Sequence, residues 1–315
     1  MPIYEASKRN IEKAAKLLIN GEVVIFPTET VYGLGANAEN RLAVQEIYRI
    51  KKRPNTHPLI VHVVDLNALN YWSQKIPKYA LSLAENFWPG PMTLILPKSQ
   101  EVKDFISVGQ QSIGLRIPDH PVARELLMKF GEMGGKGVAA PSVNIFGAVS
   151  ATTAQNSIYN LKDLENQNLF ILEGGESEIG IESTIINCLN PNPEILRPGA
   201  ISINMIESVT KTKVKDSQSK IQVSGSFDKH YSPKAKVILD VDPVPGDGFI
   251  ALEKIPTPEG VVRLMSPKDE IEFAHQLYLA FVQADILKLE RIVVSVPESG
   301  EISIAIKDRL IRAAN

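Results

Sequence analysis

A helix that stops directly before a buried strand constrains the fold of this chain more than any other feature near its start. Apolar residues recur at helical spacing from Ile11 to Ile19, and Asn20 and Gly21 then end the helix. The next residues, "EVVIFPT", form a nearly continuous apolar run that is typical of a buried strand. This order predicts a fold in which helices and strands alternate around a sheet.

The same mixture of helices and strands continues to about residue 207. Helices are predicted over about 40–51 and 78–87, and a third follows Pro121. Strands are predicted, in chain order, at "PLIVHVV", "MTLILP", "SIGLRIP", "GVAAPSVN", "NLFILE" and "ESTIINCL". We therefore expect residues 1–207 to form an α/β or α+β domain whose sheet contains both parallel and antiparallel pairs.

A change of composition marks the end of this domain. Residues 208–236 are rich in Lys and Ser and poor in large apolar side chains, as is typical of a linker. Residues 237–315 are predicted to form a small, three-layered α/β domain with a helix over about 267–288. Ser266, Pro267 and Asp269 are predicted to cap that helix.

Cysteine content and charge exclude some classes of protein. The single cysteine, Cys188, can form neither an internal disulfide nor a cysteine-based zinc site, and an unpaired thiol fits a reducing cytosol. The sequence has no signal-like start and no apolar run long enough to cross a bilayer, so we expect a soluble, cytoplasmic protein. A formal net charge of −2 disfavours, without excluding, a surface devoted to nucleic acid.

The segment "SIGLRIP" carries the most specific sign of a binding site. Strand alternation places Ile113, Leu115 and Ile117 on one face and Ser112, Gly114 and Arg116 on the other. A glycine between a hydroxyl and a guanidinium lets a small ligand approach the backbone, while the guanidinium can bind a carboxylate or phosphate through two hydrogen bonds. A solvated strand face would give the same pattern, and the segment alone does not decide between the two.

Other polar motifs add hydroxyls and cations. In "APSVN", Ser142 and Asn144 are predicted to share a strand face, although turn capping explains this motif alone better. Lys51 and Arg53 end a helix, where basic residues often serve only the helix dipole, and His62 could be a satisfied core histidine. Together these motifs offer cations and hydroxyls without matching acids, which suits a polyanion such as a nucleoside triphosphate.

Three common catalytic motifs are excluded. The segment "GEMGGKG" is not a P-loop, because Lys136 comes one position early and Gly137 replaces the Ser or Thr that would hold magnesium. The "GLG" at Gly33–Gly35 lacks the third glycine of a dinucleotide-binding fingerprint. The chain has no G-x-S-x-G motif, and its histidines are in no triad-like setting, so a serine hydrolase is disfavoured.

Several of these motifs together resemble a known enzyme family. The segments are "FPTETVYGLGANA", "KKRPNTHPLIVHV", "FWPGPMTLIL", "GLRIPDHPVARELL", "APSVNIFGAVSATTA", "GIESTIINC" and "ILRPGAIS". In this order they resemble the YrdC-like threonylcarbamoyl-AMP synthases, and "HYSPKA" with residues 237–315 resembles the two-domain branch of that family. The resemblance implies a twisted, open, mixed sheet with a concave ligand face and a smaller Rossmann-like C-terminal domain. The aromatic and basic residues of "FDKHYSPKAK", which a plain spacer does not need, predict that the linker 208–236 folds over the ATP site, with a passive tether as the alternative.

The resemblance also implies a reaction. L-threonine, bicarbonate or CO2, and ATP would give L-threonylcarbamoyl-AMP and pyrophosphate, which makes the protein a nucleotidyltransferase. The product would pass to other proteins that modify an adenosine of tRNA, and RNA binding is compatible with this reaction but not required. Mg²⁺ would be held mainly by the ATP phosphates and water, with no protein ligand.

Residue roles follow from the resemblance at matching positions. L-threonine would be bound by Thr30, His62, Arg116 and Ser183. ATP would be bound by Arg53, His57, Ser112, Ser142, Asn144, Thr152, Arg197 and Tyr231. Lys51 and Arg53 would be catalytic, with Lys51 contacting a phosphate. Glu29 could be a structural acceptor, and the glycines after Tyr32 would let the chain turn tightly at the floor of the pocket.

Two alternative functions differ in testable ways. A double-stranded RNA-binding module would use the concave face, and its RNA affinity would depend strongly on salt. The carbamoyl-transfer proteins that contain a YrdC-like domain are disfavoured, because the chain has no acylphosphatase-like or zinc-finger segment.

Overall fold

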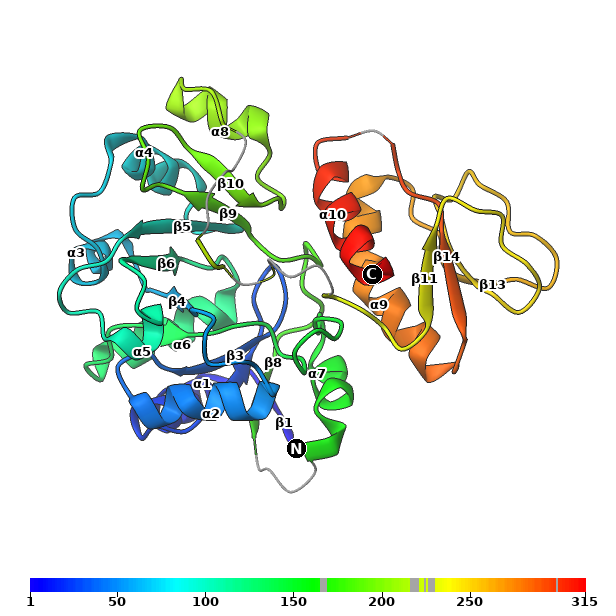
Figure 1. Cartoon of the computed structure of the whole chain (residues 1–315). Helices are drawn as coiled ribbons and strands as arrows, with labels where there is room; N and C mark the ends of the chain where they lie inside the picture. The colour runs from blue at the N-terminus through cyan, green and yellow to red at the C-terminus, as the bar shows by residue number, and fades with distance from the viewer. Residues whose placement is uncertain (165–168, 216–220, 224, 226–229, 299) are drawn as a thin grey trace.

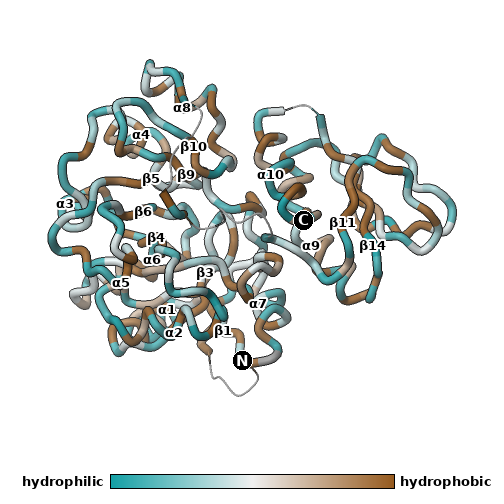
Figure 2. Tube along the Cα trace, viewed as in Figure 1, coloured by the Kyte–Doolittle hydropathy of each residue, from teal (hydrophilic) through white to brown (hydrophobic). Residues whose placement is uncertain are grey.

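The chain forms two α/β units of unequal size (Figure 1). A computed structural model describes residues 1–315 except 165–168, 216–220, 224, 226–229 and 299. Apolar residues follow the central strands of both units, and hydrophilic residues predominate along the outer loops (Figure 2). In the described ranges, no helix has the length and apolar character that crossing a membrane requires.

The larger unit is built on a ten-stranded sheet. Its strands are β1 (Ile3–Glu5), β2 (Val24–Phe26), β3 (Gly33–Asn37), β4 (Ile60–His62), β5 (Met92–Pro97), β6 (Ser112–Arg116), β7 (Val138–Ala139), β8 (Phe170–Glu173), β9 (Thr184–Asn187) and β10 (Glu194–Arg197). Their spatial order is β1-β8-β2-β3-β7-β4-β6-β5-β9-β10, and β4 pairs in parallel with β6 but antiparallel with β7. This arrangement confirms the predicted mixed sheet.

Helices cover both faces of this sheet. They are α1 (Lys8–Ile19), α2 (Arg41–Lys51), α3 (Leu69–Trp72), α4 (Lys78–Phe87), α5 (Asp104–Ser107), α6 (Pro121–Glu132), α7 (Ala154–Asn160) and α8 (Ile203–Thr210), with short 3₁₀ turns at Leu66–Ala68 and Lys162–Leu164. Because side chains alternate along a strand, Val24 and Phe26 join the apolar cluster of α1 and α6, while Ile25 joins that of α2 and α4. The helices predicted over 40–51 and 78–87 are thus present.

The predicted strand "GVAAPSVN" is much shorter in the structure. Strand β7 contains only Val138 and Ala139, and the chain bends after Pro141. Proline has no N–H to continue a strand ladder, so Ser142 and Asn144 lie on a loop rather than on one strand face. The prediction that they share a strand face is therefore wrong, although the Ser142 hydroxyl does donate a hydrogen bond to Asn144 Oδ1 at 2.7 Å.

The smaller unit contains four parallel strands and two helices. They are β11 (Lys236–Leu239), β12 (Gly248–Ile250), β13 (Val262–Met265), α9 (Glu270–Ile286), β14 (Arg291–Val294) and α10 (Ser303–Ala314). The strand order is β11-β14-β12-β13. Helix α9 begins after Asp269, whose carboxylate accepts hydrogen bonds from the N–H groups of Ile271 and Glu272. The predicted cap at Ser266 is therefore wrong, because the Asp269 carboxylate caps the helix three residues later.

This smaller unit has two layers rather than the three expected. Ile292 and Val294 of β14 pack in the apolar cluster that contains residues of both α9 and α10. Val293, which points to the other face, packs in a separate small cluster with Phe249 and Ala251. Both helices therefore lie on the same face of the sheet, the face toward the larger unit (Figure 1).

The two units share one hydrophobic core. Val31, Val149 and Ile181 of the larger unit belong to the same buried cluster as Phe273 and Leu277 of α9. The predicted linker, 208–236, starts inside α8, which extends to Thr210, and ends where β11 begins. Part of the linker, including 216–220 and 226–229, lies outside the described residues.

Candidate active site

A polar pocket lies on the part of the large sheet that the helices leave uncovered. On strand β6, Ile113 and Leu115 belong to the main core, while Gly114 and Arg116 point to the opposite face, as the alternation predicted. The pocket encloses about 610 Å³ of space, part of which is open to solvent.

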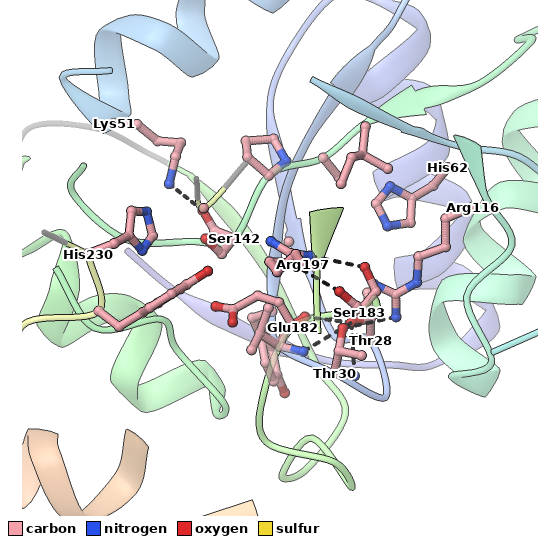
Figure 3. Close-up of a pocket in the computed structure, with 18 of the residues that line it drawn as sticks. Thr28, Thr30, Lys51, His62, Arg116, Ser142, Glu182, Ser183, Arg197 and His230 are labelled. Atoms are coloured by element: carbon pink, nitrogen blue, oxygen red, sulfur yellow. Dashed lines mark hydrogen bonds between the residues drawn. The ribbon is translucent and has the colours of Figure 1, made fainter. Parts of the chain in front are cut away.

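Segments that are distant in sequence meet at this pocket. The lining comes from the β2–β3 loop, the end of α2, strands β4 and β6, the loop after β7, the segment before β9, the end of β10, and Gly225, His230 and Tyr231. Figure 3 shows Arg116 and His62 on one side of the site, Lys51 and His230 on the other, and Arg197 between them. The site therefore depends on the folded arrangement of the whole sheet.

The pocket brings together most of the predicted ligand-binding residues. Its lining includes Thr30, Lys51, Arg53, His62, Arg116, Ser142, Ser183, Arg197 and Tyr231. The other predicted residues do not line it. Ser112 lines a smaller neighbouring pocket, the His57 ring stacks on the lining residue Phe146, and Asn144 and Thr152 are buried behind the surface. Their proposed contacts with ATP remain predictions.

Arg116 forms a buried ion pair at one end of the pocket. Its Nη2 atom donates to Glu29 Oε1 at 2.7 Å and to Thr30 Oγ1 at 2.9 Å, and both charged side chains are almost fully buried. Its Nε atom is buried without a hydrogen-bond partner among the described residues. Glu29 thus holds the guanidinium in place, while Nε remains available to a ligand in the pocket.

The β2–β3 loop is held by its own hydroxyl groups. Thr28 Oγ1 donates to the backbone oxygen of Val31 at 2.6 Å and lies 2.9 Å from Thr30 Oγ1. Gly33 and Gly35 lie in β3 rather than in a turn, and a Cβ atom at Gly35 would come within 2.6 Å of the Phe26 ring. The expectation that these glycines form a tight turn is therefore wrong, since what they permit is close packing beneath the pocket.

Lys51 is bound by protein oxygens. Its Nζ atom donates to the backbone oxygens of Ser142 and Asn144 at 2.5 and 2.8 Å, and to Asn144 Oδ1 at 3.1 Å. Burial, together with the nearby Arg53, lowers the pKa of this ammonium group well below its usual value. In this arrangement Lys51 holds the loop after β7, and its predicted catalytic role is not tested by these contacts.

The end of β10 and the start of β9 are joined by Arg197. Its Nε and Nη2 atoms donate to the backbone oxygen and the hydroxyl of Ser183, each at 3.1 Å. The Ser183 hydroxyl also lies 2.8 Å from Thr93 Oγ1. Burial lowers the pKa of Arg197, and it lowers that of Arg53 to about 10, so the Arg53 guanidinium is still charged at neutral pH.

Glu182, His230 and Phe146 are among the lining residues that were not identified from the sequence. Glu182 and His230 are polar, and Phe146 is apolar. Glu182 is an isolated acid beside Ser183 at the start of an apolar run, and His230 precedes the predicted Tyr231, so both offered weak signals. The role of Glu182 depends on Arg309, which follows it by 127 residues and donates to Glu182 Oε2 at 2.9 Å.

The two histidines of the pocket are neutral at physiological pH. Burial, together with nearby cationic side chains, lowers the pKa values of both His62 and His230 to about 3. The Nδ1 atom of each has no hydrogen-bond partner among the described residues. Each ring can therefore offer a polar nitrogen to a ligand without adding charge.

The charges of the pocket favour an anionic ligand. Lys51, Arg53, Arg116 and Arg197 line it, and Glu182 is the one carboxylate among the described lining residues. In the ranges that the structure describes, no group of three or more His, Cys, Asp or Glu side chains could hold a metal ion. The arrangement suits a polyanion next to a smaller carboxylate-bearing ligand.

Comparisons with protein-family models match nearly the whole chain. The model Sua5_yciO_yrdC, described as "Telomere recombination", matches residues 16–199. A second model, described as "Threonylcarbamoyl-AMP synthase, C-terminal domain", matches residues 201–315. The boundary between them falls a few residues before the predicted one at 207.

Curated relatives are named threonylcarbamoyl-AMP synthase. The relative from Bacillus subtilis is 40% identical over 235 residues, which is 73% of this chain and 66% of the relative. The relative from Pyrococcus abyssi is 39% identical over 235 residues, 73% of this chain and 67% of the relative. The matched stretch thus spans about two thirds of the length of each.

A solved structure matches the whole chain. Sua5 from P. abyssi, crystallised with L-threonine, has a TM-score of 0.88 and 31% identity, covering 100% of this chain and 98% of that one. YciO from E. coli matches 63% of this chain with a TM-score of 0.54 and 25% identity. These matches confirm the resemblance read from the sequence motifs and the two-unit architecture.

Proposed function

This chain belongs to the Sua5/YciO/YrdC family, and from that premise we propose that it synthesises L-threonylcarbamoyl-AMP from L-threonine, bicarbonate or CO2, and ATP. Pyrophosphate is the second product, so the enzyme is a nucleotidyltransferase. The observation that carries the proposal is a pocket with Arg116 at one side and Lys51, Arg53 and Arg197 elsewhere around it. One cavity can then hold an amino acid and a triphosphate together.

L-threonine binds at the Arg116 side of the pocket. The guanidinium, fixed by Glu29, donates from its vacant Nε to the amino-acid carboxylate. Thr30, His62 and Ser183 surround this position and supply polar contacts to the rest of the molecule. The P. abyssi complex, which contains L-threonine in a protein of the same fold, supports this assignment.

ATP binds on the side of the pocket lined by Arg53, Arg197 and Tyr231. The two guanidinium groups face the triphosphate, and Ser142 offers a hydroxyl. Lys51 fixes the loop that carries Ser142 and Asn144, so its effect on ATP is exerted through that loop as well as through its charge. His57, Ser112, Asn144 and Thr152 contact the nucleotide only if ligand binding draws these segments inward.

The reaction needs no covalent intermediate on the enzyme. The neutral amine of threonine adds CO2 and loses one proton to water, which gives a carbamate, and a carbamate oxygen forms a bond to the α-phosphorus of ATP. The bond from that phosphorus to the oxygen that bridges to the β-phosphate breaks, and pyrophosphate leaves. Arg53 and Arg197 stabilise the charge that develops on the leaving group, and the buried site holds the reactants in line.

The phosphates of ATP would hold Mg²⁺ and would supply it to the site. The carboxylate of Glu182 is already hydrogen-bonded by Tyr278 and Arg309, so the described lining residues offer Mg²⁺ no carboxylate cage. Phosphate oxygens and water can coordinate the ion instead, because Mg²⁺ commonly keeps several waters when it is bound. The product then passes to tRNA-modifying proteins in the cytoplasm, and the synthesis itself requires no RNA.

The test is an assay of pyrophosphate release by the full-length chain. Release is expected only when ATP, Mg²⁺, L-threonine and bicarbonate are all present, and omitting any one should abolish it. Equal release without threonine would contradict the proposal. Adding RNA should leave the rate unchanged, whereas RNA binding that weakens strongly with salt and no pyrophosphate release would favour an RNA-binding module.

A further inference from the structure

Helix α9 of the smaller unit presses on the segment that carries Glu182 and Ser183. A Cβ atom at Gly180, whose φ is +78°, would lie 2.5 Å from the Cα of His275. His275 Nδ1 donates toward the backbone oxygens of Ser177 and Glu178 at 3.1 and 3.0 Å. The path of the chain into the active site is therefore fixed from outside the larger unit.

The carboxylate of Glu182 is bound from the same side. Tyr278 of α9 donates its hydroxyl hydrogen to Oε2 at 3.0 Å, and Arg309 of α10 donates from Nε to the same oxygen at 2.9 Å. Ser150 donates to Oε1 at 2.6 Å. Arg309 is fully buried and also donates from Nη2 to the backbone oxygen of Pro198 at 3.0 Å. Both oxygens of this acid are thus engaged.

The same two residues support the ring of Tyr231. The rings of Tyr231 and Tyr278 stack with centroids 5.7 Å apart and an interplanar angle of 23°. The Arg309 guanidinium lies 5.1 Å from the centroid of the Tyr231 ring, in the geometry of a cation–π contact. The Tyr231 hydroxyl has no hydrogen-bond partner among the described residues. Tyr278 and Arg309 therefore set the place from which this hydroxyl meets a ligand.

We infer that Tyr278 and Arg309 are positioning residues of the active site, supplied by the C-terminal unit. Neither lines the pocket. They act by holding Glu182 and Tyr231, and this inference rests on the proposed function. By binding Glu182, they prevent its carboxylate from pairing with Arg197, whose positive charge is needed to bind the triphosphate.

These hydrogen bonds do more than join the two units. A contact that served stability alone could be made anywhere between the units, but these bonds end on a residue that lines the pocket. Against the cost of burial, Arg309 and Arg197 lower the pKa of the Glu182 carboxyl, and Figure 3 shows Glu182 beside Arg197. Without Arg309, this buried acid would be left beside Arg197, a proposed phosphate ligand. The expected defect is therefore in ATP binding, and removal of the acid should correct it.

The experiment uses four variants of the full-length chain. They are Tyr278→Phe, Arg309→Met, the double variant Arg309→Met with Glu182→Gln, and the control Lys307→Met, an exposed position on α10. Melting temperatures first show that each variant is folded at the assay temperature. KM and kcat are then measured for ATP and for L-threonine by pyrophosphate release.

Arg309→Met is expected to raise the KM for ATP at least about tenfold and to change kcat less. The double variant should bring that KM back to within about threefold of the unmodified protein, because no acid remains to compete for Arg197. Tyr278→Phe should raise it about threefold, and Lys307→Met should not change it. Unchanged KM values in a folded Arg309→Met, or no recovery in the double variant, would overturn the inference.

Two further outcomes are also decisive. If Arg309→Met does not fold, Tyr278→Phe decides through the same KM values. If the unmodified protein releases no pyrophosphate, the proposed function falls, and amide hydrogen exchange then tests the inference by itself. Exchange in residues 181–184 should be at least about tenfold faster in Tyr278→Phe or the double variant than in Lys307→Met, and equal rates would overturn it.

Discussion

Replacing Arg116 by lysine should weaken the binding of L-threonine while leaving the protein folded. The substitution keeps a positive charge beside Glu29, so the buried carboxylate retains a partner. The substitution removes the planar guanidinium group. In Arg116, Nη2 donates to both Glu29 and Thr30, and Nε is still available to a ligand. A single ammonium group cannot serve all three positions.

The magnitude follows from the loss of one hydrogen bond to a charged group. Such a bond contributes about 1.5–3 kcal/mol, and each 1.4 kcal/mol is about tenfold in affinity. The dissociation constant for L-threonine should therefore rise about 10- to 150-fold. Because the ion pair with Glu29 is kept in a weaker form, we expect only a modest loss of unfolding free energy, about 1 kcal/mol.

Isothermal calorimetry with L-threonine measures the effect, and chemical denaturation measures the stability of the same samples. Arg124→Lys is the matched control, because Arg124 is half-exposed and lies 3.7 Å from its partner Asp119, so its ion pair contributes little. A dissociation constant for Arg116→Lys within about twofold of the unmodified protein would refute the reasoning. Arg116 would then be a structural partner of Glu29 and not a threonine ligand.

Two further predictions concern buried groups. In Lys51→Met, the backbone oxygens of Ser142 and Asn144 lose a donor, so denaturation should show about 2–4 kcal/mol less unfolding free energy, with no such loss in the exposed control Lys52→Met. His62 has a pKa of about 3 when folded against 6.5 when unfolded, so the unfolded chain binds the extra proton and stability falls as pH drops below about 6.5. When the pH is lowered from about 7 to about 5, the free energy of unfolding should fall by about 2 kcal/mol less in His62→Gln than in the unmodified protein. Equal decreases in the two proteins would contradict the burial of His62.

The parts of the site that were predictable are those governed by local periodicity. Alternation along "SIGLRIP" placed Gly114 and Arg116 on the ligand face, because a strand repeats every two residues in any context. Resemblance of motifs supplied Thr30, Ser183 and Tyr231, which the structure brings to one pocket. Neither source of information required knowledge of how distant segments pack.

The errors have physical causes of two kinds. At Ser142 and Asp269, two local signals competed, and a proline and a better capping carboxylate decided the outcome. Arg309 and Tyr278 could not be found at all, because their partner Glu182 lies about a hundred residues or more away in sequence. No spacing rule connects side chains that meet only after the two units have docked.

The hydrophobic core shared by the two units bears on how this chain unfolds and how it can be divided. A shortened chain that stops near residue 207 would expose Val31, Val149 and Ile181 to water, since these buried residues pack with Phe273 and Leu277. The two units should consequently melt together in a single cooperative transition rather than one after the other. Exchanging the C-terminal unit with that of a relative would succeed only if the residues on both sides of this shared core were exchanged as a set.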